Sequence, residues 1–357
     1  MLLLANGIAW IGLLASYLSP YIDPSVHWYF ALPGLAHFWL LLVNCGFVLA
    51  WLFLRWKFAV AGAVLLAVGY NCHVHVFSPF GSPSAPENNE RSFRLMTYNV
   101  QLFKLYNWTK NKEIRNQMLE YIVSEKCDVL CLQEYFYADK QYFNTTDTLL
   151  QIQPATNHHF EAGIVRNGNH YFGLATFSRF PITGKGVIPF NQGKDHTNLA
   201  MYTDLLIHDD TIRVYNVHLA SNHLDTKQVD DILEGSERSW ITTRHWLRKL
   251  RQGYKLRSAQ IRKISASIQA SPYPVVVCGD FNDVPVSYTY RTLSKGLRDA
   301  FLGSGEGLGA TYNGRLPNLR IDYILHSPGL SSHSFSVPHQ GFTDHFPVVC
   351  TLSADRK

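Results

Sequence analysis

The chain has 357 residues, enough for one large domain with a smaller segment attached. Its net charge of +5 is mildly basic, which suits a phosphate-bearing partner but does not by itself indicate nucleic acid. Six cysteines, all in apolar surroundings, exclude a small disulfide-rich scaffold, and we interpret them as buried thiols.

The first eighty residues contain only three charged side chains, those of Asp23, Arg55 and Lys57. Three apolar runs in this region approach or exceed the roughly 20 residues that a helix needs to cross a bilayer. They are Leu2–Leu18, Trp28–Leu54 and Phe58–Val76. We therefore predict a membrane segment over residues 1–80 with about three transmembrane helices.

The orientation of this segment follows from its few basic residues. Arg55 and Lys57 are the only ones in the short connections between runs, and basic connections favour the cytoplasmic side. A cleaved signal peptide is the alternative for the first run, but that run has neither a basic start nor a clear small-residue cleavage site. The sequence thus predicts a multi-pass integral membrane protein whose remaining chain lies on the extracytoplasmic side of the lipid bilayer.

Residues 81–91 form a polar stretch rich in Pro, Ser and Asn, which we interpret as a linker to a domain over residues 92–357. Helical patterns in this domain cover Lys112–Glu125 and Lys227–Ile268. Short β-type runs read FRLMTYNV, DVLCLQEY, HYFGLATFSRF, NLAMYTDLLI, TIRVYNVHLA, PVVVCGDFN, RIDYILHS and HFPVVCTL. Because some runs are separated by helices and others only by turn residues, we expect an α/β (α+β) fold with mixed sheets and helices outside.

The second helical pattern contains a basic stretch from Ile241 to Lys263, with Trp246 and Tyr254 inside it. This stretch either meets anionic lipid headgroups or another polyanion, or is a solvated helix face whose aromatic residues pack on the sheet. The sequence leaves both interpretations open.

Several apolar β-type runs end in polar side chains. Burying a carboxylate or amide inside such a strand costs on the order of 2–7 kcal/mol of folding free energy unless the group has a hydrogen-bonding or ionic partner. One divalent cation can be the partner of several such groups. Carboxylate and amide oxygens suit Mg²⁺ or Mn²⁺, and histidines suit proton transfer or phosphate stabilisation. The residues concerned are Asn99, Glu134, Asn216, His218, Asp280, Asn282, Asp322, Asp344 and His345.

Other chemistries lack their sequence motifs. The chain contains no Cys-x-x-Cys and no HExxH, which argues against a closed structural zinc site. It also contains no Walker A loop, no GxGxxG and no GxSxG. The remaining interpretation is metal-assisted attack of water on phosphorus.

These motifs resemble the endonuclease/exonuclease/phosphatase superfamily, the DNase I-like metal-dependent phosphohydrolases. The matching stretches occur in the family's order and cover Phe93 to Leu352. They read MTYNVQLF, LCLQEY, GLATFSRFPI, VYNVHLASNH, VVVCGDFNDVP, TYNGRLPNLRIDYIL and GFTDHFPVV. The resemblance implies a four-layer α-β-β-α sandwich, in which two mixed β-sheets pack face to face with helices on both outer faces.

The resemblance also implies a metal site. Asn99 and Glu134 resemble the family's metal-binding pair, with Glu134 as the principal ligand of Mg²⁺ or Mn²⁺. Asp344 resembles the residue that completes or supports this site.

The remaining motif residues resemble those that act on the substrate. Asp280 and Asn282 match the pair that handles the nucleophilic water and the scissile phosphate. His345 resembles the histidine that contacts the phosphate and takes part in proton transfer, and Asp322 resembles the acid that orients it. His218 matches a position for phosphate contact or general acid catalysis. Which of Asp280 and His345 acts as the base stays open.

Several charged residues have a structural interpretation beside the functional one. Asp322 is able to pair with Arg320 instead, and Asp283 reads as a turn residue after its strand. Arg179 and Arg257 are either phosphate contacts or members of structural ion pairs.

The sequence does not single out one substrate. It lacks the WTDRIL signature of phosphoinositide phosphatases and the tryptophan-rich insertions of abasic-site nucleases. A membrane-anchored phosphoesterase fits a phospholipid, sphingolipid or glycolipid headgroup, or nucleic acid outside the cytoplasm. The alternative is a non-catalytic membrane module that binds a phosphate-bearing ligand, but the residues that degenerate relatives usually lose are all present. No protein partner is indicated.

Overall fold

A computed structural model of the protein describes residues 1–79, 81, 92–107, 112–138, 145–152, 156–190, 197–221, 239–314 and 319–354. The chain folds into two compact units. The helical unit comprises Met1–Ser78, Ser221–Ile261 and Asp283–Lys295, and the sandwich unit comprises Pro79–Ala220, Arg262–Asn282 and Gly296–Lys357. The predicted linker lies outside the described residues except for Gly81, and the predicted domain boundaries stay a prediction.

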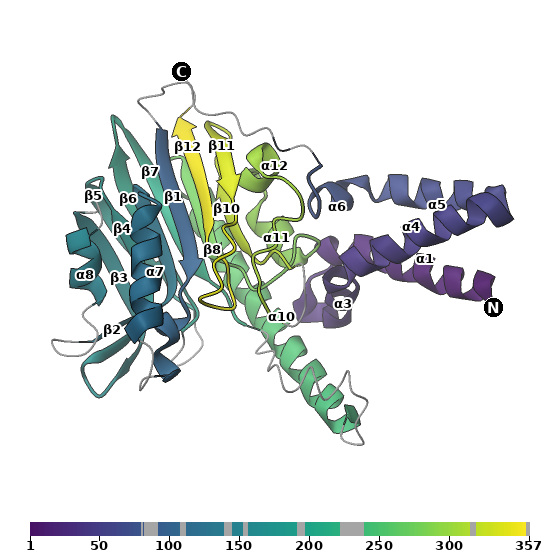
Figure 1. Cartoon of the computed structure of the whole chain (residues 1–357), viewed down its shortest axis with the longest axis horizontal. Helices are drawn as coiled ribbons and strands as arrows, with labels where there is room; N and C mark the ends of the chain where they lie inside the picture. Colours follow the sequence, from purple (N-terminus) through teal and green to yellow (C-terminus); the bar gives the residue numbers. More distant parts are fainter. Residues whose placement is uncertain are drawn as a thin grey trace. The chain divides into compact units, whose positions relative to one another are not determined.

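Three longer helices begin the helical unit: α1 (Leu2–Leu18), α4 (His37–Leu54) and α5 (Trp56–Val68). Figure 1 shows them side by side, with α4 in contact with both α1 and α5. Short helices lead from α1 to α4, and another follows α5. They are η1 (Ser19–Tyr21), α2 (Pro24–His27), η2 (Trp28–Phe30), α3 (Ala31–Leu35) and α6 (Tyr70–Val74).

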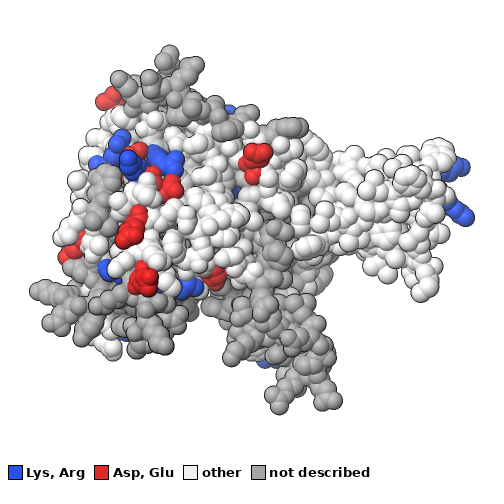
Figure 2. All heavy atoms as spheres, in the orientation of Figure 1, with Lys and Arg blue, Asp and Glu red and all other residues white. Residues whose placement is uncertain are grey.

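Among the described residues, two stretches are long and apolar enough to cross a membrane, Leu2–Tyr21 and His37–Leu54, and α5 is a shorter apolar helix. The second predicted run starts at Trp28, but the backbone leaves the helical conformation at Ala36 and α4 begins only at His37. Arg55 and Lys57 lie exposed at the turn between α4 and α5. On the face in view, Figure 2 shows charged side chains on these helices only at that turn.

Later parts of the chain complete the helical unit. The first part of α10 (Ser239–Gln269) packs there, because Leu250 and Tyr254 form a buried cluster with Ala31 of α3. Trp246 joins this cluster, so Trp246 and Tyr254 of α10 pack on the N-terminal segment and not on a sheet. The segment Asp283–Lys295, with α11 (Tyr288–Leu293), is the other late element. The part of the predicted helix before Ser239 lies outside the described residues.

The sandwich unit contains two six-stranded sheets in the described part of the chain (Figure 1). The first has the order β11-β12-β1-β2-β4-β3 and the second the order β5-β6-β7-β8-β10-β9. Both are mixed, because β1 pairs with β2 and β7 pairs with β8 in parallel, while the other pairs are antiparallel. The predicted mixed sheets are therefore confirmed.

The strands have the following bounds. In the first sheet they are β1 (Ser92–Asn99), β2 (Val129–Ala138), β3 (Asn157–Arg166), β4 (His170–Ser178), β11 (Leu330–Ser336) and β12 (Val348–Ala354). In the second they are β5 (Ile182–Ile188), β6 (Leu199–Ile207), β7 (Asp210–His218), β8 (Val275–Asp280), β9 (Arg298–Asp299) and β10 (Asp322–His326).

The main core lies between the two sheets. Leu95 and Cys350 of the first sheet share one buried cluster with Val276, Cys278 and Ile324 of the second. Side chains alternate across a strand, so every second residue of the VVVC run faces this core. The cysteines of the core carry free thiols, as predicted.

Helices cover the outer faces, as the resemblance implies. On the first sheet, α7 (Lys112–Ser124) and α8 (Thr145–Ile152) bury Met118, Ile122 and Leu149 in a second cluster. On the second sheet, the last turns of α10 contact β7, where Ser267 lies 3.1 Å from the hydroxyl of Tyr215. Two short helices complete the unit, η3 (Gln101–Asn107) and α12 (Ala300–Ser304).

Candidate active site

The polar strand ends meet at one end of the sandwich because of how the strands pair. In the parallel pair of β7 and β8, His218 lies opposite Asp280. In the antiparallel pair of β8 and β10, Asp322 lies opposite the same residue. From the first sheet, the Asn99 side chain at the end of β1 donates a hydrogen bond of 3.0 Å to Asp280 Oδ2. Asp280 is thus the meeting point of the two sheets.

Asp280 is 1% exposed and is held by the residues that follow it. The Asn282 amide side chain donates to its Oδ2 at 3.0 Å, and the Asn282 backbone N–H donates to its Oδ1 at 2.8 Å. Asn282 has a φ of 52°, a left-handed conformation that Asn tolerates better than most residues. Gly279 has a φ of 131°, and a Cβ there would lie 2.0 Å from the Val217 oxygen. The Gly-Asp-Phe-Asn motif is therefore a requirement of the backbone as well as of the chemistry.

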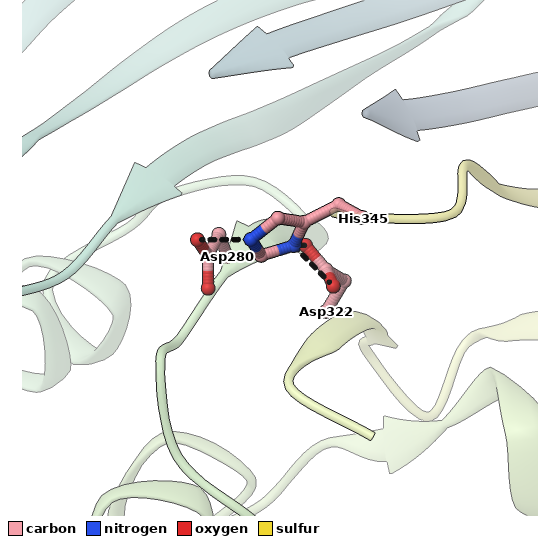
Figure 3. Close-up of side chains that lie close together, drawn as sticks. All are labelled: Asp280, Asp322 and His345. Carbon is pink, nitrogen blue, oxygen red and sulfur yellow. Dashed lines mark hydrogen bonds and ion pairs between the residues drawn. The ribbon is translucent and has the colours of Figure 1, made fainter. Parts of the chain in front are cut away.

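His345 lies between two carboxylates, as Figure 3 shows. Its Nδ1 is 3.0 Å from Asp322 Oδ2, and its Nε2 is 3.7 Å from Asp280 Oδ2. Burial alone would lower the pKa of His345, but the Asp322 and Asp280 carboxylates outweigh it and raise the pKa to about 10. Burial also raises the pKa of Asp322 to about 6, against the opposing charge of His345. At neutral pH the pair is an imidazolium that donates to a carboxylate.

The alternative partner of Asp322 is engaged elsewhere. Arg320 Nη1 lies 2.7 Å from Asp299 Oδ2, and both side chains are buried. The predicted role of Asp322 beside His345 therefore has the geometry it needs.

Glu134 and His218 form the other side of the site. His218 is 2% exposed, and its Nε2 lies 3.7 Å from both Glu134 Oε1 and Asp280 Oδ2. This Nε2 is buried and has no hydrogen-bond partner among the described residues. The pairing of β2 with β4 shifts register between Leu132 and Tyr135, so an irregularity turns Glu134 out of the regular strand, with a φ of 47°.

The site offers donors that fit a divalent cation. Glu134 and Asp280 present carboxylate oxygens, and the buried Nε2 of His218 lies 3.7 Å from both without a hydrogen-bond partner among the described residues. Such a donor set suits Mg²⁺ or Mn²⁺. Asn99 turns its Nδ2 toward Asp280, while its Oδ1 accepts from the Gln101 backbone N–H at 3.1 Å. A second set, Asp280, Asp322 and His345, has ligand atoms within 4.8 Å of one another. There, however, Asp322 and His345 already satisfy each other, and we favour the set that contains Glu134.

Contacts of 3.7 Å or less connect seven of the eight predicted site residues: Asn99, Glu134, His218, Asp280, Asn282, Asp322 and His345. Asp344 is the exception, because its side chain makes no hydrogen bond among the described residues. It is close enough for its charge to contribute to the raised pKa of His345 and of Tyr312.

Two residues near the site were not predicted to act there. The Tyr312 backbone bridges to His345, and the two rings meet edge to face at 5.7 Å. Tyr312 occurs in the TYNGRLPNLRIDYIL motif, but nothing in that pattern marks it as facing the site. Asn198 donates at 2.9 Å to the Leu219 carbonyl, which also accepts from the Asn282 side chain.

Other polar residues highlighted by the sequence have structural roles. The Asn216 side chain lies between the sheets, where it accepts from Gln133 at 2.7 Å and donates to the Ala175 carbonyl at 3.0 Å. Arg179 pairs with Asp128 at 3.0 Å. Arg257 pairs with Asp283, which is buried and so is more than a turn residue.

Comparisons with known proteins agree with this fold. The sequence model of the Endonuclease/Exonuclease/phosphatase family matches residues 96–345. A second model, described as a domain of unknown function (DUF8431), matches residues 1–76. No curated protein sequence matches the chain.

Solved structures show the same fold. An endonuclease/exonuclease/phosphatase from Beutenbergia cavernae is 19% identical, with a TM-score of 0.54 over 74% of this chain and 72% of that one. A Bacteroides vulgatus member is 16% identical, with a TM-score of 0.53 over 74% and 99%. The human nocturnin catalytic domain, solved with a bound sulfate, is 20% identical, with a TM-score of 0.50 over 74% and 95%. By its sequence and by its fold, the chain belongs to the endonuclease/exonuclease/phosphatase family.

Proposed function

We propose that the protein is a membrane-anchored, divalent-metal-dependent phosphoesterase that cleaves a phosphodiester or phosphomonoester by attack of water. Membership of the family supports hydrolysis of a phosphoester bond. The observation that carries the proposal for this chain is the convergence of Asp280, His345 and Asp322 with the Asn99 and Glu134 side chains. These groups come from both sheets and form one polar site at the end of an apolar sandwich.

The proposed ligands of Mg²⁺ or Mn²⁺ are Asn99 and Glu134, with Asp344 completing or supporting the site. Glu134 is the principal ligand in this assignment, since its side chain is 30% exposed and therefore accessible from solvent. When bound, the cation neutralises charge on the phosphate oxygens.

The remaining residues act on water and phosphate. Asp280 and Asn282, fixed to each other, hold the attacking water. His345, as an imidazolium, presents its Nε2–H to the phosphate or the leaving oxygen, and Asp322 keeps the ring oriented. His218 presents Nε2 to the same place and contacts the phosphate or acts as the general acid.

The substrate is a phosphate ester of a phospholipid, sphingolipid or glycolipid headgroup, or an extracytoplasmic nucleic acid. The proposed multi-pass topology counts α5 as a third crossing after the two candidate spans, so that the chain passes from a cytoplasmic turn at Arg55 and Lys57 to the extracytoplasmic side, where the sandwich unit would lie. Anchoring raises the local concentration of lipid, which favours a headgroup.

The proposed function is tested with the purified full chain in detergent. Hydrolysis of bis-p-nitrophenyl phosphate, and of a phospholipid, sphingolipid and nucleic-acid panel, is measured with Mg²⁺, Mn²⁺ and EDTA. We expect metal-dependent turnover that Glu134→Ala and His345→Ala strongly reduce. Wild type as inert as both variants on every substrate would favour the non-catalytic binding module instead.

A further inference from the structure

The residue that follows the catalytic loop is anchored by a buried ion pair. Asp283 comes directly after Asn282 and is 5% exposed. Its Oδ2 lies 3.3 Å from Arg257 Nε and accepts a hydrogen bond of 2.7 Å from Thr289. Arg257 of α10 is fully buried, with its guanidinium 4.5 Å from the centre of the Tyr254 ring. The path of the chain beyond Asn282 is thus set by α10.

The pair lies where the two compact units join along the chain. Asp283 and Arg257 belong to the helical unit, whereas Asp280 and Asn282 belong to the sandwich unit. A single peptide bond connects Asn282 to Asp283. Whatever holds Asp283 therefore also restrains Asn282, whose side chain and backbone both bind Asp280.

The N-terminal segment in turn holds the elements that carry this pair. Ser258, next to Arg257, donates a hydrogen bond of 2.5 Å to Asp23, between α1 and α4. Further along the chain, the Arg291 guanidinium stacks 4.2 Å from the centre of the Tyr21 ring.

Apolar packing adds to these polar contacts. Leu250 and Tyr254 of α10 bury against Ala31. At Gly34, an added Cβ would lie 2.3 Å from the Val286 carbonyl oxygen, so the chain after Asp283 approaches too closely for any side chain there. Both α10 and the segment from Asp283 thus pack on the short helices between α1 and α4.

We propose that the N-terminal helical segment is a working part of the enzyme and not only an anchor, because it positions the Asp280–Asn282 loop through α10 and the Arg257–Asp283 pair. Arg257 and Asp283 are positioning residues, which act through Asn282. This inference rests on the proposed function of that loop, but its structural claim has tests that need no turnover.

Hydrogen exchange of the full chain in neutral phospholipid nanodiscs tests the structural claim. Arg257→Met removes the charge that faces Asp283, and Arg248→Met is the matched control, because Arg248 is exposed on the same helix. We expect amides 279–282 to exchange at least tenfold faster in Arg257→Met alone, with β1 amides unchanged. Unchanged amides 279–282, or equal acceleration of β1, would overturn the proposal. Asp283→Asn, which keeps the side-chain shape, repeats the test if Arg257→Met does not fold.

Steady-state kinetics test the effect on catalysis. Misplacement of a reacting group by about 1 Å costs on the order of 100-fold in rate. We expect Arg257→Met and Asp283→Asn to lower kcat by about 10- to 100-fold, with the half-saturating Mg²⁺ concentration within about twofold of wild type, because Glu134 is not displaced. The double variant should be no slower than the slower single variant. Wild-type kcat in folded single variants would overturn the proposal.

Cleavage of the linker separates a positioning role from a simple tether. A protease site placed within residues 82–91 is cut in the folded, detergent-solubilised protein. We expect both fragments to co-purify and to retain the activity of the uncut protein. Fragments that separate and a fully active released fragment would overturn the inference. If wild type hydrolyses nothing, the proposed function fails, while hydrogen exchange and co-purification still decide the positioning claim.

Discussion

At the scale of single residues, the proposed mechanism assigns metal binding and proton transfer to different side chains. Glu134 is partly exposed at an irregularity of β2, whereas His345 is buried against Asp322. Substitutions at these two positions should therefore affect different measurements.

We expect Glu134→Gln to raise the Mg²⁺ concentration needed for half-maximal rate, because an amide is a weaker ligand than a carboxylate. His345→Ala should lower kcat by about 10²- to 10⁴-fold with little change in that Mg²⁺ concentration, because it removes a proton donor. Titration of activity with Mg²⁺ in both variants checks this division, and an equal loss of Mg²⁺ affinity in the two would contradict it.

The histidine also makes the stability of the metal-free protein depend on pH. The pKa of His345 rises on folding from 6.5 to about 10, so its stabilising effect is complete below about pH 6.5 and is lost as pH rises through 10. Burial raises the pKa of Asp322 to about 6, below this window, so that carboxylate is mostly ionised across it. In EDTA, we expect Tm to fall more steeply from pH 6.5 to 10 in wild type than in His345→Asn. If Tm fell with pH equally steeply in the two proteins, the result would contradict the His345–Asp322 ion pair.

The sequence identified polar residues that lie together at the strand ends, but not the support of Asp283. Family motifs place Asp280 and His345 at strand ends, where their neighbours are other motif residues. The partner of Asp283 is Arg257, on a helix whose arginines look alike in sequence. Burial distinguishes Arg257 from Arg248, and burial depends on which face of α10 meets the rest of the helical unit. A local pattern contains no such information.

At the scale of elements, sequence patterns found the central strands and missed the edges. The eight predicted runs correspond to β12, β1, β2 and β4 of one sheet and to β6, β7, β8 and β10 of the other. The edge strands β3, β5, β9 and β11 were not predicted. Each pairs on one side only and carries polar or glycine residues, as in ITGKGVI and LSSHSFS. Strands buried on both sides have an apolar signature, and edge strands lack it.

The turn from β8 into the Asp280–Asn282 loop should tolerate no side chain at Gly279. We expect Gly279→Ala to lower the free energy of unfolding by about 3 kcal/mol or more, because strain adds to overlap with the Val217 oxygen. Gly168→Ala is the control, since Gly168 has a φ of 71° with open space around it and should cost about 1 kcal/mol. Denaturant unfolding measures both, and equal losses would show that the close approach is unimportant.

At the scale of the whole molecule, the proposed topology makes a labelling prediction. In a chain whose Cys45 and Cys72 are replaced by Ala, we expect Gly168→Cys, at the exposed β3–β4 turn, to react with a membrane-impermeant maleimide on intact cells. Lys57→Cys, beside the basic turn, should react only after permeabilisation. The reverse pattern would invert the orientation and place the active site in the cytoplasm.

The helical unit is assembled from separate segments of the chain, and this has a consequence for biosynthesis. This unit is built from Met1–Ser78, Ser221–Ile261 and Asp283–Lys295, so its parts are far apart in the chain. The ribosome releases the apolar helices first, but their partners on α10 and α11 emerge only about 200 residues later, which takes on the order of 10–40 s at typical synthesis rates. During that interval, the surface around Ala31 and Gly34 is not yet buried by α10 and the segment that contains α11. Maturation of the N-terminal segment is therefore complete only when nearly the whole protein has been synthesised.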